Sequence, residues 1–157
     1  MNYYFTTTVS LGFDEAIEAV TKELQKEGFG VLTEIDVKAT LKKKLDVDFR
    51  NYRILGACNP TFAHQALQRE SHIGTMLPCN VIVQERHDGR IEVSTINPLE
   101  AMQAVANPEL EEIAQFVGND HPEHAMLEAA ARFYERIAED VDGDNVETTA
   151  LDRFVGR

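Results

Sequence analysis

The feature that most constrains the fold is a tight-turn signal in the middle of the chain. Two runs rich in apolar and β-branched residues, 79–85 and 90–96, are separated by four residues that include His87, Asp88 and Gly89. The Asp-Gly pair favours the positive backbone φ that a short hairpin needs. A regular parallel α/β protein joins its strands by long crossovers and has no place for this hairpin. We therefore predict an α+β fold with a mostly antiparallel sheet and helices on one face.

The rest of the chain alternates between strand-like and helix-like patterns. Alternating polar and apolar residues predict three more strands, which makes about five in total: residues 2–9, 29–37 and 52–57. Apolar residues recurring every three or four positions predict helices: residues 13–27, a short one over 37–45, 61–69, 109–117 and 122–141. The predicted order is β-α-β-(short α)-β-α-β-β-α-α. Residues 71–78 are predicted to form a loop.

Helix boundaries are marked by short signals. Asparagine followed by proline occurs at positions 59, 97 and 107. Asparagine is a favoured N-cap and proline is favoured at the first helical position, so each pair predicts a helix start. Gly28 predicts the end of the helix over 13–27.

Length and charge limit the classes of function. The 157 residues suffice for one domain with a single core. Residues 1–96 hold 11 basic and 13 acidic side chains (−2), and residues 97–157 hold 4 and 14 (−10), which gives −12 in all. This charge argues against nucleic acid and membrane surfaces as partners. No apolar run approaches the length of about 18 residues that a membrane span needs, and no secretory signal is evident, so we expect a cytoplasmic protein.

Several separate motifs resemble one family. They are Phe13 to Ile17, Gly28 to Val37, Gly56 to Pro60 and Leu77 to Val81. On these residues the chain resembles the domain-of-unknown-function family 302, over about residues 2–117. The resemblance implies a curved antiparallel sheet that grips a long helix, as in the helix-grip or TATA-binding-protein group. It also implies a homodimer, and it implies no settled activity.

The chain departs from the family pattern after Val117. Residues Gly118 to Asp120 interrupt the helical pattern, and a longer acidic extension follows them. We therefore predict three parts. The first is a family-like α+β domain over residues 1–117. The second is a helical C-terminal extension over 118–142 that packs on the same domain, and the third is a loose acidic tail over 143–157.

The two cysteines of the chain mark the candidate site. Cys58 closes one predicted strand, Cys79 opens the next, and each is followed by asparagine. If the intervening helix returns the chain to the same end of an antiparallel sheet, the thiols meet there. The N-terminus of that helix would favour the Cys58 thiolate. Three interpretations stay open: buried residues in tight turns, a pair that holds a ligand, metal or sulfur species, and a disulfide.

A divalent metal at this place would need more ligands than two thiols. His64, one turn into the helix after Cys58, is the nearest further candidate, and His72 is the second. The predicted metal set is therefore Cys58, Cys79 and His64. An acidic stretch over residues 140–147 resembles a calcium loop, but Asn145 stands where an EF-hand needs glycine, so we reject a calcium site.

Charged side chains offer two weaker candidates. In the strand predicted over 29–37, Glu34 and Asp36 lie opposite the face expected for Val31, Thr33 and Ile35. Such a carboxylate pair could act as acid and base if it lined a pocket, although a solvated strand face explains it more simply. One basic block could bind a small anion or the acidic tail of a partner subunit, although a solvated helix face explains it better: Lys38, Lys42, Lys43, Lys44, Arg50 and Arg53.

Three functional hypotheses follow. The first is a small, soluble, dimeric domain that binds a small ligand, a metal or a sulfur species, with a small molecule or a sulfur carrier as partner. Its predicted binding residues are Cys58, Asn59, Cys79, Asn80 and Glu34. The second is a structural or interaction protein in which the cysteines only shape turns. The third is a hydrolase-type enzyme that uses Glu34 and Asp36.

Overall fold

The computed structural model describes residues 3–97 together with 101, 105 and 107. These residues form β1 (Tyr4–Val9), α1 (Phe13–Lys26), β2 (Gly30–Asp36), α2 (Val37–Leu45), β3 (Tyr52–Cys58), α3 (Pro60–Arg69), the 3-10 helix η1 (Ser71–Met76), β4 (Cys79–Glu85) and β5 (Ile91–Ile96). Among the described helices, none has the length and apolar character of a membrane span. The helices predicted over 109–117 and 122–141, the extension over 118–142 and the tail over 143–157 lie outside the described residues.

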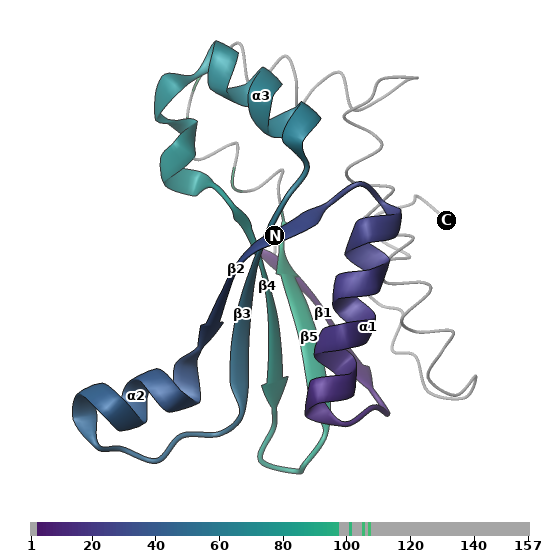
Figure 1. Cartoon of the computed structure of the whole chain (residues 1–157), viewed down its shortest axis with the longest axis vertical. Helices are drawn as coiled ribbons and strands as arrows, with labels where there is room; N and C mark the ends of the chain where they lie inside the picture. Colours follow the sequence, from purple (N-terminus) through teal and green to yellow (C-terminus); the bar gives the residue numbers. More distant parts are fainter. Residues whose placement is uncertain (1–2, 98–100, 102–104, 106, 108–157) are drawn as a thin grey trace.

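The strands form one sheet in the order β1-β5-β4-β3-β2, and every neighbouring pair is antiparallel. β1 and β2 are the two edges, so the sheet is not closed into a barrel. Helix α1 lies along the sheet, whereas α3 lies beyond one end of the strands (Figure 1). The predicted α+β class, with an antiparallel sheet of about five strands, is confirmed.

One face of the sheet packs against α1. The buried residues Ala16, Val20 and Leu24 recur every four positions along the helix. They meet the buried side chains of the three central strands, which are Leu55, Ala57, Val81, Val83, Ile91 and Val93. The apolar stripe predicted over residues 13–27 therefore faces the core, as expected for an amphipathic helix.

The opposite face carries a row of side chains in register across all five strands. Ile35, Ile54 and Ile82 lie side by side on β2, β3 and β4, and Ser94 and Thr6 continue the row on β5 and β1. Ile35 is 47% exposed, and Ile54 and Ile82 are half-buried. The three isoleucines lie outside the core cluster under α1. They form an apolar surface, here called the isoleucine row.

Strand β2 departs from the predicted alternation. Its register with β3 shifts between Val31 and Thr33, which leaves Leu32 as the extra residue of a β-bulge, 68% exposed. A bulge moves the residues after it to the other face of the strand. Val31 therefore packs on the core under α1, whereas Thr33 and Ile35 face away. The prediction that Val31, Thr33 and Ile35 share one face is wrong. The sequence pattern continues to alternate through Leu32 and so gives no sign that this residue is inserted in a bulge.

The β4–β5 connection confirms the predicted hairpin. The Arg86 N–H donates to the Arg90 carbonyl at 2.8 Å, and the Gly89 N–H donates to the Arg86 carbonyl at 2.9 Å. Gly89 has a φ of +81°, the left-handed conformation that glycine adopts without strain. Asp88 accepts the Arg90 N–H at 3.1 Å and so braces the turn.

The segment predicted as a loop over residues 71–78 contains the helix η1 instead. The Glu70 carboxylate accepts the His72 N–H at 3.0 Å, and the Glu70 carbonyl accepts the Ile73 N–H at 3.2 Å. Ile73 is 3% exposed, so burial of its side chain helps to hold a helix that local preference alone does not predict.

A close approach at Gly56, in the central strand β3, yields a stability prediction. A Cβ atom there would lie 2.1 Å from Thr33 Oγ1 and 2.6 Å from Pro78 Cγ. Gly56→Ala should therefore lower the free energy of unfolding by about 2 kcal/mol. The matched control is Gly30→Ala, on β2 with no atom within 4 Å of the new Cβ, which should change it by no more than about 0.5 kcal/mol. Denaturant titration measures both, and equal stabilities would contradict the close contact.

Candidate functional site

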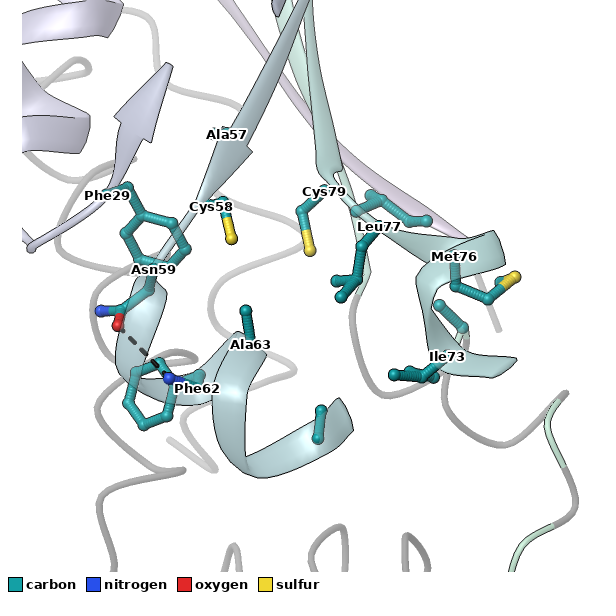
Figure 2. Close-up of a pocket in the computed structure, with 13 residues that line it drawn as sticks. Phe29, Ala57, Cys58, Asn59, Phe62, Ala63, Ile73, Met76, Leu77 and Cys79 are labelled. Atoms are coloured by element: carbon teal, nitrogen blue, oxygen red, sulfur yellow. Dashed lines mark hydrogen bonds between the residues drawn. The ribbon is translucent and has the colours of Figure 1, made fainter. Parts of the chain in front are cut away.

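Strands β3 and β4 bring the cysteines to the same end of the sheet. β3 ends at Cys58, and β4 begins at Cys79. Cys79 pairs with Ala57, the residue before Cys58. Both cysteines line one cavity, and both sulfur atoms point into it (Figure 2). The structure thus places together the two residues on which the sequence hypothesis depends, and no disulfide joins them.

Asn59 fixes the start of α3 next to this cavity. Its side-chain oxygen accepts the N–H groups of Thr61 at 3.1 Å and Phe62 at 3.4 Å, and Pro60 occupies the first helical turn. The predicted N-cap and proline start are therefore confirmed. Three residues on one side of α3 line the cavity: Phe62, Ala63 and Ala66.

The turn between α1 and β2 supplies another wall. The Gly28 N–H donates to the Gln25 carbonyl at 3.0 Å, and the Phe29 N–H donates to the Leu24 carbonyl at 2.9 Å. With a φ of +80° at Gly28, this is a Schellman C-cap, and the predicted helix stop is confirmed. The cap turns the chain back over the end of the sheet, where the Phe29 ring lines the cavity (Figure 2).

The third wall comes from η1 and was not predicted. Ile73, Met76 and Leu77 line the cavity from this side. Ile73 also forms a small buried cluster with Ala66, against which Leu77 and Val105 pack. The spacing of residues 73, 76 and 77 is i, i+3, i+4, which is the sequence signal that could have revealed a helical turn here.

The resulting cavity is mainly apolar. Its empty volume, open mouth included, is about 610 Å³. Polar side-chain atoms come from Cys58, Cys79 and Asn59, and the remaining lining residues are Phe29, Ala57, Phe62, Ala63, Ala66, Ile73, Met76, Leu77, Ile96 and Ala101. Carboxylates, ammonium groups and imidazoles are missing from this set of described residues. Such a lining suits an uncharged and largely apolar ligand.

Burial favours the protonated form of both thiols. It raises the pKa of Cys58, and it is also the main cause that raises the pKa of Cys79, with a smaller contribution from the neighbouring charge of Cys58. The expectation that the helix N-terminus favours a Cys58 thiolate is therefore wrong. The physical reason is that burial of the thiol outweighs any effect of the helix N-terminus, where the Asn59 side chain already accepts two N–H groups.

Three predicted site residues, His64, Asn80 and Glu34, do not line the cavity. His64 is exposed on α3, and Asn80 is exposed on the sheet face that carries the isoleucine row. The structure therefore does not assemble the predicted metal set of Cys58, Cys79 and His64. In the described part of the chain, no group of three or more His, Cys, Asp and Glu side chains is placed to hold a metal ion.

Glu34 and Asp36 lie on β2, away from the cavity lining. Both pair with the guanidinium of Arg53 on β3, which contacts Glu34 through Nη1 and Asp36 through Nη2 at 3.2 Å. The two carboxylates share one strand side, as the sequence predicts. Their shared cation links the edge strand to its neighbour, which favours a structural role over acid–base work.

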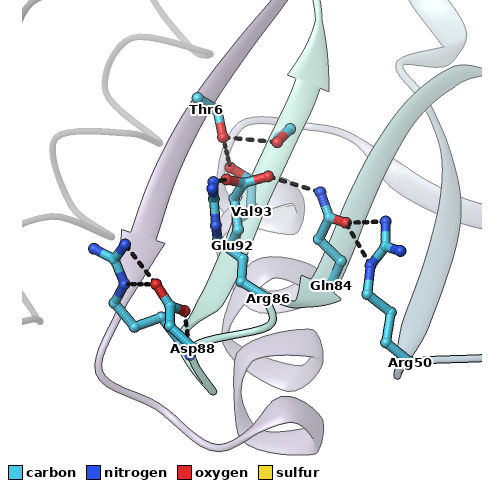
Figure 3. A network of polar contacts seen from close by, with 9 residues as sticks. Thr6, Arg50, Gln84, Arg86, Asp88, Glu92 and Val93 are labelled. Carbon is cyan, nitrogen blue, oxygen red and sulfur yellow. Dashed lines mark hydrogen bonds and ion pairs between the residues drawn. The ribbon is translucent and has the colours of Figure 1, made fainter.

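A polar network on the sheet face opposite α1 was missed by sequence reasoning. Glu92 is 9% exposed, and its carboxylate accepts the Gln84 amide at 2.7 Å and pairs with Arg86. Gln84 in turn accepts two bonds from Arg50, at 2.8 and 3.1 Å. This chain of contacts, drawn in Figure 3, joins β4 and β5 to the segment before β3. Its charges are partnered, so it stabilises the sheet.

Several side chains of the basic block also have partners. Lys42 lies 2.9 Å from Asp46 and 3.2 Å from Asp48. These carboxylates, Asp46 first, raise the pKa of Lys42. Lys38 donates to Asn51 at 3.0 Å. These exposed pairs contribute little stability, and they give no argument for an anion site.

Comparison with known proteins places the chain in a family. The sequence model described as "Domain of unknown function DUF302" matches residues 5–132, which continues past Val117. A crystal structure of an uncharacterized conserved protein DUF302 from Bacillus stearothermophilus is 30% identical, with a TM-score of 0.69 over 82% of this chain and 96% of that chain. No match was found among curated proteins. The chain therefore belongs to the DUF302 family, as its motifs between Phe13 and Val81 predict.

Proposed function

We propose that the protein is a binding domain that takes up a small, mainly apolar molecule in the cavity between Cys58 and Cys79. The observation that supports this is the lining itself, in which two protonated thiols and one amide stand among apolar side chains. Small-molecule sites combine apolar walls with a few polar groups that fix the orientation of the ligand. The cytoplasm expected for this chain would keep the thiols reduced.

Binding accounts for the lining better than thiol catalysis does. A nucleophilic cysteine needs a nearby base or a lowered pKa. Neither a histidine nor a carboxylate lines the cavity among the described residues, and burial raises the pKa of both thiols. In a binding site the thiols would contact the ligand directly. A thiol is a weak hydrogen-bond donor, and its polarisable sulfur packs well against aromatic rings.

We also propose that two copies associate through the isoleucine row, since the family resemblance implies a homodimer. The row offers three neighbouring isoleucines on the face opposite α1, and Ile35 is 47% exposed. Two copies related by a twofold axis could pack their rows against each other and so remove both apolar patches from water.

The cavity proposal can be tested with N-phenyl-1-naphthylamine, a neutral dye that fluoresces in apolar surroundings. Ala63 lines the cavity and faces the thiols (Figure 2). Ala63→Leu should fill this space and weaken dye binding by about tenfold or more. The matched control is His64→Leu, because His64 is the next residue of α3 and is exposed. Dye binding that is unchanged in Ala63→Leu would contradict the proposal.

A second measurement keeps the proposal testable even if Ala63→Leu does not fold. The chain contains no tryptophan, so Phe62→Trp places a single indole in the cavity wall. Energy transfer from this tryptophan to the bound dye should appear on titration. Dye fluorescence without energy transfer would place the dye elsewhere.

Both thiols should lose their protons at a higher pH than an ordinary thiol does. Because burial raises their pKa, alkylation of the native protein by iodoacetamide should speed up with pH only above the ordinary thiol range. In Cys58→Ser the midpoint for Cys79 should fall, since the neighbouring charge is gone, yet stay above the ordinary value because burial remains. Folding stability should correspondingly fall as pH rises through this range. A midpoint below that of a model thiol would refute the assignment.

The dimer proposal is tested by light scattering on size-exclusion fractions. Ile35→Glu places a charge on the isoleucine row and should convert a dimer to a monomer. Leu32→Glu is the control, because Leu32 lies in the bulge of the same strand, outside the row, and is 68% exposed. A monomeric parent protein, or dissociation by both variants alike, would count against the row as the interface.

A further inference from the structure

Two sulfur atoms dominate the chemistry of the cavity. Among its lining residues, sulfur comes from Cys58, Cys79 and Met76, and a side-chain amide comes from Asn59. The Met76 sulfur is turned away from the thiols (Figure 2). The Asn59 oxygen already accepts two N–H groups of α3. A bound centre would therefore meet two thiols as its donor atoms.

This environment restricts which centre fits. Zinc in proteins takes four strong ligands in a structural site and three in a catalytic one, and the described residues gather no such set here. A monovalent soft ion held by two thiolates would leave one net negative charge. None of the described lining side chains carries a compensating positive charge, and burying an unpaired charge is costly. The centre that fits needs two sulfurs and ends uncharged.

We propose that Cys58 and Cys79 form a dithiol site for trivalent arsenic that carries one organic group. This inference rests on the proposed function, because it needs the same accessible cavity. A centre R–As(OH)₂ forms two As–S bonds and loses both hydroxyl groups, which leave with the two thiol protons as two molecules of water. Arsenic stays trivalent, no electron is transferred, and the adduct carries no charge.

The surroundings of the thiols fit the organic group. The two sulfur atoms lie at neighbouring strand ends, because Cys79 pairs with Ala57, and they point into the same space (Figure 2). Phe29, Phe62 and Leu77 line that space. An aryl or alkyl group on arsenic would lie against these apolar side chains and be removed from water, which is favourable. Thiols, in turn, are the soft ligands that soft centres select.

Phenylarsine oxide is the probe that tests this site. One equivalent should bind to the native, reduced full-length protein, visible as a single phenylarsenic adduct in the intact mass. N-ethylmaleimide added afterwards should label neither cysteine. Addition of 2,3-dimercaptopropanol should remove the adduct and restore labelling of both thiols.

The two cysteines provide their own matched variants. Cys58→Ser and Cys79→Ser each leave one thiol, so the chelate is lost and affinity for the arsenical should fall by about 100-fold or more. Circular dichroism checks that each variant is folded. Binding by either variant as tight as that of the parent would overturn the proposal. So would a parent protein whose thiols react with N-ethylmaleimide but take up no phenylarsenic.

The outcomes also separate this site from the broader binding function. If N-phenyl-1-naphthylamine enters the cavity but no arsenic adduct forms, the dithiol site is refuted and the binding function stands. If neither compound enters, both are refuted. If the adduct forms and the protein that carries it no longer binds the dye, the two compounds compete for the same cavity, as the proposal requires.

Discussion

Burial of one side of α1 on the three central strands is the constraint on which the rest of the domain depends. The helix covers the sheet as far as Leu24, and the chain then turns back at Gly28. Beyond that point a second, smaller cluster forms around Ala66 and Ile73 under α3 and η1. The cavity is lined by members of both clusters. It therefore lies where one core ends and the next begins, a place where packing need not be complete.

The convergence of the cysteines depends on the ends of the strands. In a regular antiparallel pair, side chains alternate between faces, so Cys79 shares a face with its partner Ala57 and not with Cys58. Cys58, however, is the last residue of β3, and the chain leaves the sheet at Asn59 to begin α3. Both thiols can then point into the space beyond the sheet (Figure 2). Strand alternation alone would have kept them apart.

How much the sequence could predict depends on the range of each interaction. The hairpin at Gly89, the cap at Asn59 and the helix stop at Gly28 are set by residues a few positions apart, and all three were predictable. The bulge at Leu32 and the buried position of Glu92 are set by neighbouring strands. Such features depend on tertiary packing, which local patterns do not contain.

For the candidate site, too, some features could be predicted from the sequence and others depend on tertiary packing. That Cys58 and Cys79 share one end of the sheet followed from the order of the elements, because an antiparallel return brings both strand ends together. The spacing of residues 73, 76 and 77 could have indicated a helical turn, but neither its place beside the sulfurs nor the raised pKa of both thiols followed, since both depend on tertiary packing. The exposed position of His64 depends on the rotation of α3 about its axis, which the spacing of one histidine cannot fix.

The distribution of charge bears on the kind of ligand that the proposed binding function would take. Over residues 1–96 the basic and acidic side chains nearly balance, 11 against 13. Many of them are paired with one another, as Arg53 is with Glu34 and Arg86 is with Glu92. The lining of the cavity has no charged side chain among its described residues. An ion placed in such a lining would lose hydration without gaining a counter-charge from these side chains, so the proposed binding function calls for a neutral ligand.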